Sequence, residues 1–497
     1  MTLIGAISLG VTYFTDGDYG HVRFWTNLLH NTAFFTGIAF ASLFFLSTHV
    51  VAWGGWQTIF KRVPEAMMMF MPVGLIFFGL IALGVYMDAE GTDYLYLWSD
   101  ETALVEDHLV VHKSAFLNPF NYVLTLVVLG VWTLFAMMIR RLSLEQDGDR
   151  SLRKVNYEKI HMWSAIFLPI AGFSSAYAIW QWVMSVDVHW YSTLFAWYAT
   201  VSVWVSAICI IFLLILFLQS RGHMQYFTKE HTHDLGKYIF GFSVFWTYLW
   251  FSQFLLIWYA NNGEETQYFD LRFDQFPAVF YLNILLNFIL PFFILMMNNS
   301  KRAKGTLALV AVIVLLGHWV DYFQMIKPGV WHNWEHAQHA GHGHGDDHGH
   351  GEEGHDAHGD LLHLNQAPKA VLTANPQHGD DAHGEEGHTE EAPATTENDS
   401  ATAAETTAPA ETHAHDTEDA HATAHGEEAH TEEAHAEHPT QFVMGIHFPG
   451  LLELGTMIGF LGLFLFVTFQ VLSGASLMPK NDPYVDESKH HHVWYDL

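Results

Sequence analysis

The chain has one cysteine in 497 residues, Cys209, and this residue lies within an apolar run. A single thiol cannot form a disulfide within the chain. It also cannot supply the paired cysteines that attach c-type haem or the set of cysteines that ligates an iron–sulfur cluster. We therefore expect no covalently bound cofactor and no iron–sulfur centre held by this chain alone.

Positive charge is also scarce, with 21 Lys and Arg against 52 Asp and Glu and a net charge of −31. Most of the excess is local. Between His332 and Thr440 there are 25 Asp or Glu and one basic residue, Lys369, which accounts for 24 of the 31 negative charges. The composition therefore indicates a nearly neutral, apolar body and an acidic segment in one polypeptide.

The apolar body is divided into runs of about 20 residues, the length at which a helix crosses a hydrocarbon core of about 30 Å. Nine predicted spans cover residues 31–53, 66–87, 119–139, 162–183, 192–218, 237–260, 276–297, 305–326 and 449–473. A tenth, at 1–14, is too short to span comfortably and lacks the basic start of a signal peptide. It is either a tilted first helix or a segment whose start lies upstream.

The basic residues between these runs are distributed unevenly, as expected when cytoplasmic loops retain Lys and Arg. Of the 21, 16 fall in alternate connections: Lys61, Arg62, Arg140, Arg141, Arg150, Arg153, Lys154, Lys159, Arg221, Lys229, Lys237, Lys301, Arg302, Lys304, Lys480 and Lys489. This asymmetry predicts that these connections and both termini are cytoplasmic.

These observations predict an all-α integral membrane protein, a bundle of about ten transmembrane helices. We expect residues 1–331 to hold the first nine, 332–440 to form a long His/Asp/Glu-rich outer loop, 441–478 to contain the last helix and 479–497 to be a cytoplasmic tail. The loop cannot bury enough apolar surface to offset the entropy of ordering, so the sequence predicts that it is disordered.

The outer loop contributes 20 His between residues 332 and 438. Such clusters bind transition metals weakly, and His342, His344, His348 and His350 are the densest candidates, but they lack the fixed spacing of a defined site. A solvated tether that buffers metal or protons is one interpretation, and a metal-delivery function is the other. A metal transporter would also need ligands at matching depth inside the membrane, and the sequence offers few.

The clearest polar group inside a predicted span is GHWVDYFQMI, residues 317–326. His318, Asp321 and Tyr322 have i, i+3 and i+4 spacing, which places them on one helical face. Imidazole, carboxylate and phenol in contact are what proton relay requires. The alternative is a structural hydrogen-bond cluster that locks two helices together, and the residues alone leave both open.

Other polar residues in the spans give weaker signals. Asn283 and Asn287 form an i, i+4 pair that either extends a polar stripe or joins helices. Glu453 is expected near the outer mouth of the last span. His49 is expected about 6 Å and His318 about 20 Å from the cytoplasmic end of their spans, so they cannot share an ion or a haem.

Two further stretches hold candidates at the predicted membrane surfaces. Asp187 and His189 lie in the turn within QWVMSVDVHWYSTLFAWYA, where Asp187 either caps the following helix or forms the outer mouth of a proton or quinone path. His231, His233 and Asp234 lie at the cytoplasmic start of an aromatic-rich helix, where a helix N-terminus favours negative charge.

The stretches MSVDVHWYSTLFAWYA, HTHDLGKYIFGFSVFWTYLWFSQFLLIWYA, LLGHWVDYFQMI and LMPKNDPYVDESKHHH occur in this order in the chain. Together they resemble the F-type membrane subunit of bacterial alternative complex III, a member of the NrfD-like family. The resemblance covers residues from about 115 to 327 and from 441 to the end.

This resemblance implies a subunit of a quinol:cytochrome c oxidoreductase in the bacterial inner membrane, with no redox centre of its own and with the His-rich loop in the periplasm. The implied partners are a C-type NrfD-like subunit that holds the quinol site, a multihaem cytochrome c, an iron–sulfur protein and membrane lipids, with no nucleic acid. Haem c and iron–sulfur centres would belong to those partners.

The resemblance also implies that this subunit offers proton half-channels. His318, Asp321 and Tyr322 would belong to the outward half, and His231, His233 and Asp234 to the inward mouth. The family pattern has an acidic residue where this chain has Gln181, and an amide does not exchange protons at physiological pH. A stand-alone proton-coupled or metal transporter is the alternative function.

Overall fold

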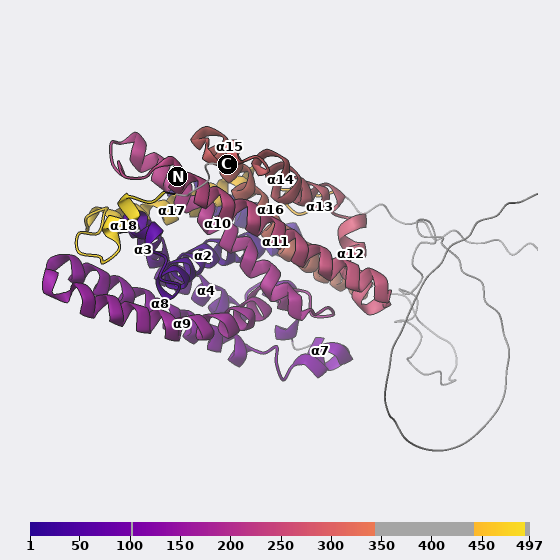
Figure 1. Ribbon diagram of the computed structural model, residues 1–497. Coiled ribbons are helices and arrows are strands. Elements are labelled where there is room, and N and C mark those ends of the chain that lie inside the picture. The colour runs from indigo at the N-terminus through magenta and orange to yellow at the C-terminus, as the bar shows by residue number, and fades with distance from the viewer. Residues whose placement is uncertain (101–102, 343–441, 493–497) are drawn as a thin grey trace, which may run out of the picture. The chain divides into compact units, whose positions relative to one another are not determined.

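The computed structural model describes residues 1–100, 103–342 and 442–492, and these belong to one compact unit of packed helices with no strand among them (Figure 1). Nine helices in this part of the chain are long and apolar enough to cross a membrane. They are α2 (Val22–Val51), α3 continued by η3 and α4 (Arg62–Met67, Met68–Phe70 and Met71–Tyr86), α8 (Pro119–Gly148), α9 (Arg153–Trp182), α10 (Thr193–Ser220), α11 (Lys229–Ala260), α13 continued by η7 and α14 (Pro277–Ile284, Leu285–Ile289 and Leu290–Leu295), α16 (Lys304–His342) and α17 (Leu451–Ser473).

Shorter helices connect or flank these spans. They are α1 (Thr2–Thr15), η1 (Gly17–Tyr19), η2 (Gly55–Phe60), α5 (Thr92–Leu95), η4 (Leu97–Ser99), α6 (Ala103–Glu106), α7 (His108–Lys113), η5 (Arg150–Leu152), η6 (Met184–Val186), α12 (Gly263–Asp274), α15 (Asn298–Arg302) and α18 (Val485–Lys489). The nine predicted spans are thus confirmed as helices. The His-rich segment predicted to be a loop lies outside the described residues, apart from its first part, which continues α16 to His342.

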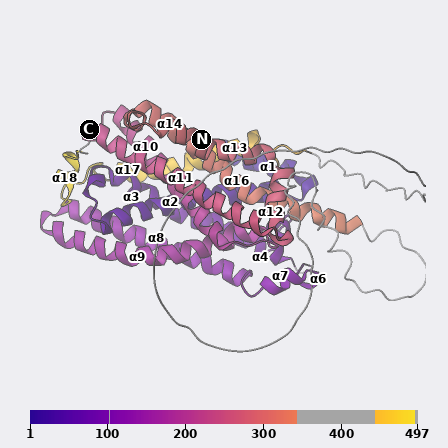
Figure 2. The same ribbon diagram turned by 45° about the vertical axis from the view of Figure 1, so that its right-hand side comes forward.

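Helices α2 and α10 form the centre of the bundle, because most of their apolar stretches are buried by other helices. A helix that is hydrophobic all round must be covered on all sides, either by protein or by lipid. Helices α8 and α9 lie side by side along the lower edge of the bundle in both views (Figure 1, Figure 2). Their outward apolar side chains are exposed, Phe173 at 84% for example, as expected for a surface that faces lipid.

The predicted tenth segment is α1, a helix of 14 residues that packs antiparallel to α17. Gly5 and Gly459 face each other so closely that a Cβ built on either would lie within 2.4 Å of the other's Cα. Small residues permit this kind of close backbone approach between membrane helices. Met1 contacts Gly462, so α1 lies along the part of α17 that precedes Gly462.

Different segments lie at the two ends of the bundle. We call the end with the C-terminal segment 480–492 the tail side, and the end with α7, α12 and residues 442–450 the loop side. In both views α18 is at the left and α7 and α12 are at the right (Figure 1, Figure 2). Helix α17 runs from the loop side to the tail side, because residues 442–450 precede it and the C-terminal segment follows it.

One irregular turn positions a polar side chain of interest. The span that begins at Pro277 contains a π-helical turn, η7, and Pro291 follows it. Such π turns bulge one residue out of the regular α-helical ladder and are frequent at functional sites. Asn287 lies in this turn and contacts α16 at Gly317, where a Cβ would meet its Oδ1 at 2.3 Å.

Candidate functional site

The carboxylate of Asp321 is the centre of the largest polar cluster within the spans. Asp321 lies on α16 and is fully buried. Its Oδ1 accepts hydrogen bonds from the Tyr198 hydroxyl and from Asn283 Nδ2 at 2.8 Å, and its Oδ2 accepts one from Trp246 Nε1 at 2.9 Å. Donors from α10, α11 and α13 therefore converge on one carboxyl group, as burial of a polar group requires.

His318 lies one turn before Asp321 and completes the cluster. Its Nδ1 is 3.9 Å from Asp321 Oδ2 and 3.0 Å from the Ser202 hydroxyl, and both side chains of the His–Asp pair are fully buried. Its Nε2 has no hydrogen-bond partner among the described residues. The predicted contact between His318 and Asp321 is confirmed. Nδ1 of this imidazole lies beside the carboxyl group, and Nε2 could exchange a proton with a further group.

The pair of asparagines extends this cluster along the bundle. Asn287 Nδ2 donates to Asn283 Oδ1 at 2.5 Å, and Asn283 Nδ2 donates to Asp321. The amides therefore form a chain of side-chain hydrogen bonds that ends at the carboxylate. Both interpretations of the pair stay open, because these bonds extend a polar stripe and also join the span that begins at Pro277 to α16. The π turn explains how Asn287 reaches the interface with α16.

Tyr322, by contrast, does not bond to Asp321. Its hydroxyl donates to the backbone oxygen of Ala199 at 3.1 Å, and the phenol that bonds to the carboxylate belongs to Tyr198. The sequence analysis did not single out Tyr198. A signal was present, since Tyr198, Ser202 and Ser206 recur every four residues and form a polar stripe on a helix that is otherwise apolar.

A small cavity adjoins Tyr198 toward the loop side. Its lining includes Tyr198, Gln253, Arg272 and Gln324, and its volume of about 10 Å³ is close to what one water molecule needs. Arg272 Nε and Nη2 and Gln324 Oε1 are buried and have no partner among the described residues. A donor and an acceptor therefore lie on the cavity wall, and one water could bond to both.

Arg272 is held in place by α12, which lies at the loop side. Its Nη1 donates to the Tyr268 backbone oxygen at 2.6 Å, and its guanidinium lies 3.3 Å from the Tyr268 ring centroid. Stacking of this kind is favourable for a cation over an aromatic face. Arg272 was not expected to be a site residue, because in sequence it belongs to a polar connection between two spans.

Asp187 is the next acidic group toward the loop side. Burial raises the pKa of its carboxyl group, and the positive charges of Arg272 and Lys113 oppose this rise. The prediction that Asp187 caps the following helix is wrong, because the residue at the N-cap of α10 is Ser192. Asp187 lies instead in the turn between η6 and α10, within range of the positive charge of Arg272.

His189 and Asp187 have no hydrogen-bond partner in common within the described residues. Its Nε2 is 2.5 Å from Oδ2 of Asp107, whose other oxygen accepts from the backbone at the start of α7. Burial alone would raise the pKa of Asp107, but the hydrogen bond and charge of His189 lower it below the usual value. His189 therefore fixes a surface connection at the loop side.

Glu453 lies in the first turn of α17 at the loop side, where a mouth was expected, but its carboxylate is buried and pairs with the partly exposed Arg23. Its carboxylate accepts from Arg23 Nε and Nη2 at 2.6 and 2.9 Å, from Asn27 Nδ2 at 3.0 Å and from the Gly450 backbone at 3.0 Å. Charge-assisted bidentate pairs of this kind are strong and directional. Glu453 therefore joins α17 to α2.

The candidates at the tail side are not brought together with Asp321. His49 bonds to Phe45 O at 2.7 Å and to the Tyr238 hydroxyl at 3.1 Å. His231 caps its own helix through Thr228. Asp234 pairs with Lys237 and with His491 of the C-terminal segment, each at 2.5 Å.

His233 is also buried at this end of α11. Gln181, where the family pattern has an acid, donates to Phe116 O at 2.9 Å, as a structural amide would. The bonds described for His49, His231, Asp234 and Gln181 do not reach the Asp321 cluster.

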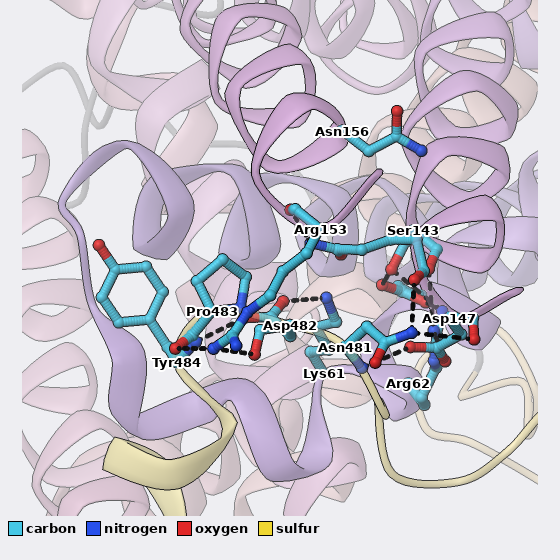
Figure 3. Close-up of polar contacts among 12 residues, drawn as sticks. Lys61, Arg62, Ser143, Asp147, Arg153, Asn156, Asn481, Asp482, Pro483 and Tyr484 are labelled. Carbon is cyan, nitrogen blue, oxygen red and sulfur yellow. Dashed lines mark hydrogen bonds and ion pairs between the residues drawn. The ribbon is translucent and has the colours of Figure 1, made fainter. Parts of the chain in front are cut away.

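A second buried ionic cluster at the tail side was not expected (Figure 3). Arg62 pairs with Glu65 and with Asp147, each at 2.5 Å, and the Ser143 hydroxyl donates to Glu65 at 2.6 Å. Arg62 and Glu65 are each 1% exposed. Sequence reasoning placed them at the edge of a span, where charges are inexpensive, so nothing indicated that they are covered.

Metal ligands do not gather in the described part of the chain, where no three His, Cys, Asp or Glu side chains lie close enough to hold an ion. Of the weak candidates in the His-rich segment, His342 is the last residue of α16, and His344, His348 and His350 lie outside the described residues. A scan of the chain against protein-family models finds no match, and a comparison with curated proteins finds none either.

Proposed function

We propose that the chain is a non-haem membrane subunit of a quinol:cytochrome c oxidoreductase complex, an NrfD-like subunit similar to the F-type subunit of alternative complex III. In this proposal the Asp321 cluster moves protons between the interior of the bundle and the loop side. The single observation that carries it is Asp321 itself, a fully buried carboxylate bonded to a phenol and lying beside an imidazole.

A route from Asp321 to the loop side is supported by the order of the polar groups. Tyr198 bonds to Asp321 and also lines the cavity that Arg272 and Gln324 line, and the positive charge of Arg272 acts on the carboxyl group of Asp187. A water in the cavity would connect the phenol to the outer groups, because water both donates and accepts. Ionisable groups in a membrane interior usually line such paths, since their burial is costly otherwise.

Quinol oxidation is assigned to a partner subunit in this proposal. The cavity beside Tyr198 and the cavity beside Glu65 have volumes of about 10 and 20 Å³, so each suits water and neither holds a quinone ring. The redox centres, haem c and iron–sulfur clusters, would likewise belong to a multihaem cytochrome c and an iron–sulfur protein. This chain would anchor those partners and carry protons.

The proposed orientation places the tail side in the cytoplasm and the loop side, with the His-rich segment, in the periplasm of a bacterial inner membrane. It is supported by Lys61, Arg62, Arg153 and Lys480, which all lie at the tail side. Short loops retain Lys and Arg on the cytoplasmic side. In this orientation α1 packs along the periplasmic half of α17, and nine helices of the described residues are long enough to span the membrane.

Purification tests the proposal. The full-length chain, tagged and extracted in mild detergent from its own membranes, should bring with it a multihaem cytochrome c and an iron–sulfur protein in fixed ratio, visible by mass spectrometry and haem absorbance. Isolation as a lone homo-oligomer would contradict it. That result would favour the alternative, a proton-coupled or metal transporter whose 20 His between residues 332 and 438 buffer metal ions.

A further inference from the structure

The C-terminal segment 480–492 crosses the tail side and bonds to five parts of the bundle. Asn481 Nδ2 donates to backbone oxygens of Gln146 and Asp147 at the end of α8. The backbone oxygen of Pro483 accepts from Arg153 at 3.1 Å, and Asp482 forms an ion pair with Lys61 (Figure 3). The segment is therefore attached to α8, to the start of α9 and to the connection before α3.

The second half of the segment is attached to η2 and α11. The Ser488 hydroxyl donates to Trp56 O at 2.6 Å and accepts from the Ile59 backbone at 3.1 Å. The segment passes so close to η2 that a Cβ on Gly55 would meet the Glu487 carboxylate at 2.8 Å. His491 bonds to Asp234 at 2.5 Å, which extends the attachment to α11.

A cavity of about 20 Å³ lies beneath this segment. Gln57, Thr58, Glu65 and Ser143 of the bundle line it, and Asp482 and Tyr484 of the C-terminal segment form part of its wall. Gln57 Oε1 is buried and has no partner among the described residues. A cavity of this size with an unpartnered acceptor and several polar side chains in its wall can hold a water molecule.

The attachments of the segment are mostly polar. Asp482, Val485 and Ser488 are its buried residues, and of these only Val485 is apolar, whereas Asp486, Glu487 and His490 are exposed. Segments with few buried apolar contacts open locally well before a protein unfolds globally. The segment can therefore leave the cavity while the helices stay packed.

We propose that residues 480–492 are a removable cover, whose release from the tail side opens the cavity and admits water to the buried carboxylate of Glu65. The inference concerns access to the cavity and does not depend on the function proposed above. In the closed state Asp482 and Tyr484 form part of the wall between the cavity beside Glu65 and the tail side. In the open state the cavity faces the solvent.

Cysteine labelling tests the cover, because the chain has a single native cysteine and this residue, Cys209, is fully buried. Thr58→Cys places a nearly isosteric thiol in the cavity wall. The full-length chain in detergent is treated with a charged methanethiosulfonate reagent, and mass spectrometry separates labelling at position 58 from labelling at Cys209. The rate is compared with and without Ser488→Ala, which removes both Ser488 bonds to η2.

Ser488→Ala should raise the labelling rate at position 58 about tenfold, since two hydrogen bonds that hold the cover are lost. Ser476→Ala is the matched control, because the Ser476 hydroxyl bonds only to Met478 O, within the connection that follows α17. An unchanged rate in Ser488→Ala would overturn the proposal. A parallel rise at Cys209 would overturn it too, since the segment would then hold the bundle together and would not cover one cavity.

Discussion

The hydroxyl of Tyr198 on α10 donates a hydrogen bond to Asp321 on α16, and both side chains are buried. The same phenol lines the small cavity on the side of Arg272. Tyr198 therefore lies between the buried carboxylate and the polar groups of the loop side. A phenol in this position either passes a proton or holds two helices together, and substitutions distinguish these roles.

Tyr198→Phe should leave the subunit in its complex and slow proton release to the loop side during quinol oxidation by about tenfold or more. The loss of this buried hydrogen bond should also cost about 1 to 3 kcal/mol of stability. Proton release is measured with a pH dye outside proteoliposomes. Tyr322→Phe is the control, since the Tyr322 hydroxyl bonds to the Ala199 backbone. Equal effects of the two substitutions would assign Tyr198 a structural role.

Gln324→Leu should slow proton release without lowering stability. The Gln324 amide oxygen is buried without a partner in the described part of the chain, so an apolar side chain of similar size removes a desolvated acceptor. The unfolding midpoint in detergent should stay the same or rise slightly. Met325→Leu, in the wall of the same cavity, is the control. Normal proton release in Gln324→Leu would exclude the cavity from the route.

Glu453→Gln should lower the free energy of unfolding by about 3 kcal/mol, because it leaves the partly buried guanidinium of Arg23 without its carboxylate. Thermal unfolding in detergent measures the loss. Glu145→Gln removes an ion pair with Arg141 that is exposed to solvent and should change stability by less than about 1 kcal/mol. A loss that is no larger in Glu453→Gln than in Glu145→Gln would show that this pair does not join α17 to α2.

Stability should depend on pH through Asp93, in the connection that follows α4. Burial and the neighbouring charges of Asp88 and Asp100 raise the pKa of Asp93 to about 6. Because the folded protein binds this proton more tightly than the unfolded chain, stability falls as the pH rises from about 4 to 6 and stays reduced above that range.

Asp93→Asn should therefore stabilise the protein at pH 8, by less than about 1 kcal/mol because the group is only partly buried, and the gain should shrink toward pH 4. The unfolding midpoint of the variant and of the parent chain across this range measures the difference. A gain that is equal at both pH values would contradict the assignment to the charge of Asp93.

The membrane spans and the buried carboxyl group of Asp321 could be predicted from the sequence. Nine apolar runs predicted nine helices, because length and hydropathy decide which segments can cross a bilayer. His318 and Asp321 have i, i+3 spacing, and the helix makes them neighbours without any knowledge of the tertiary fold. The asparagine pair followed from the same periodicity.

What the sequence did not reveal depends on contacts between helices that are far apart in the chain. Tyr198 is 123 residues from Asp321, and Arg23 is 430 residues from Glu453. Arg62 was assigned to a cytoplasmic connection, and its burial together with Glu65 follows from contacts with α8, which is distant in the chain. The expected cap at Asp187 was wrong because the chain makes one more turn before α10 begins at Thr193.

The most direct test of the proposed function is the number of protons released per electron by the complex with Asp321→Asn. The amide keeps the shape of the side chain and can still accept from Tyr198 or Trp246, so assembly with the haem and iron–sulfur subunits should persist. We expect electron transfer from quinol with clearly fewer protons appearing at the loop side of proteoliposomes. Unchanged turnover together with unchanged proton stoichiometry would show that Asp321 is structural and would contradict the account.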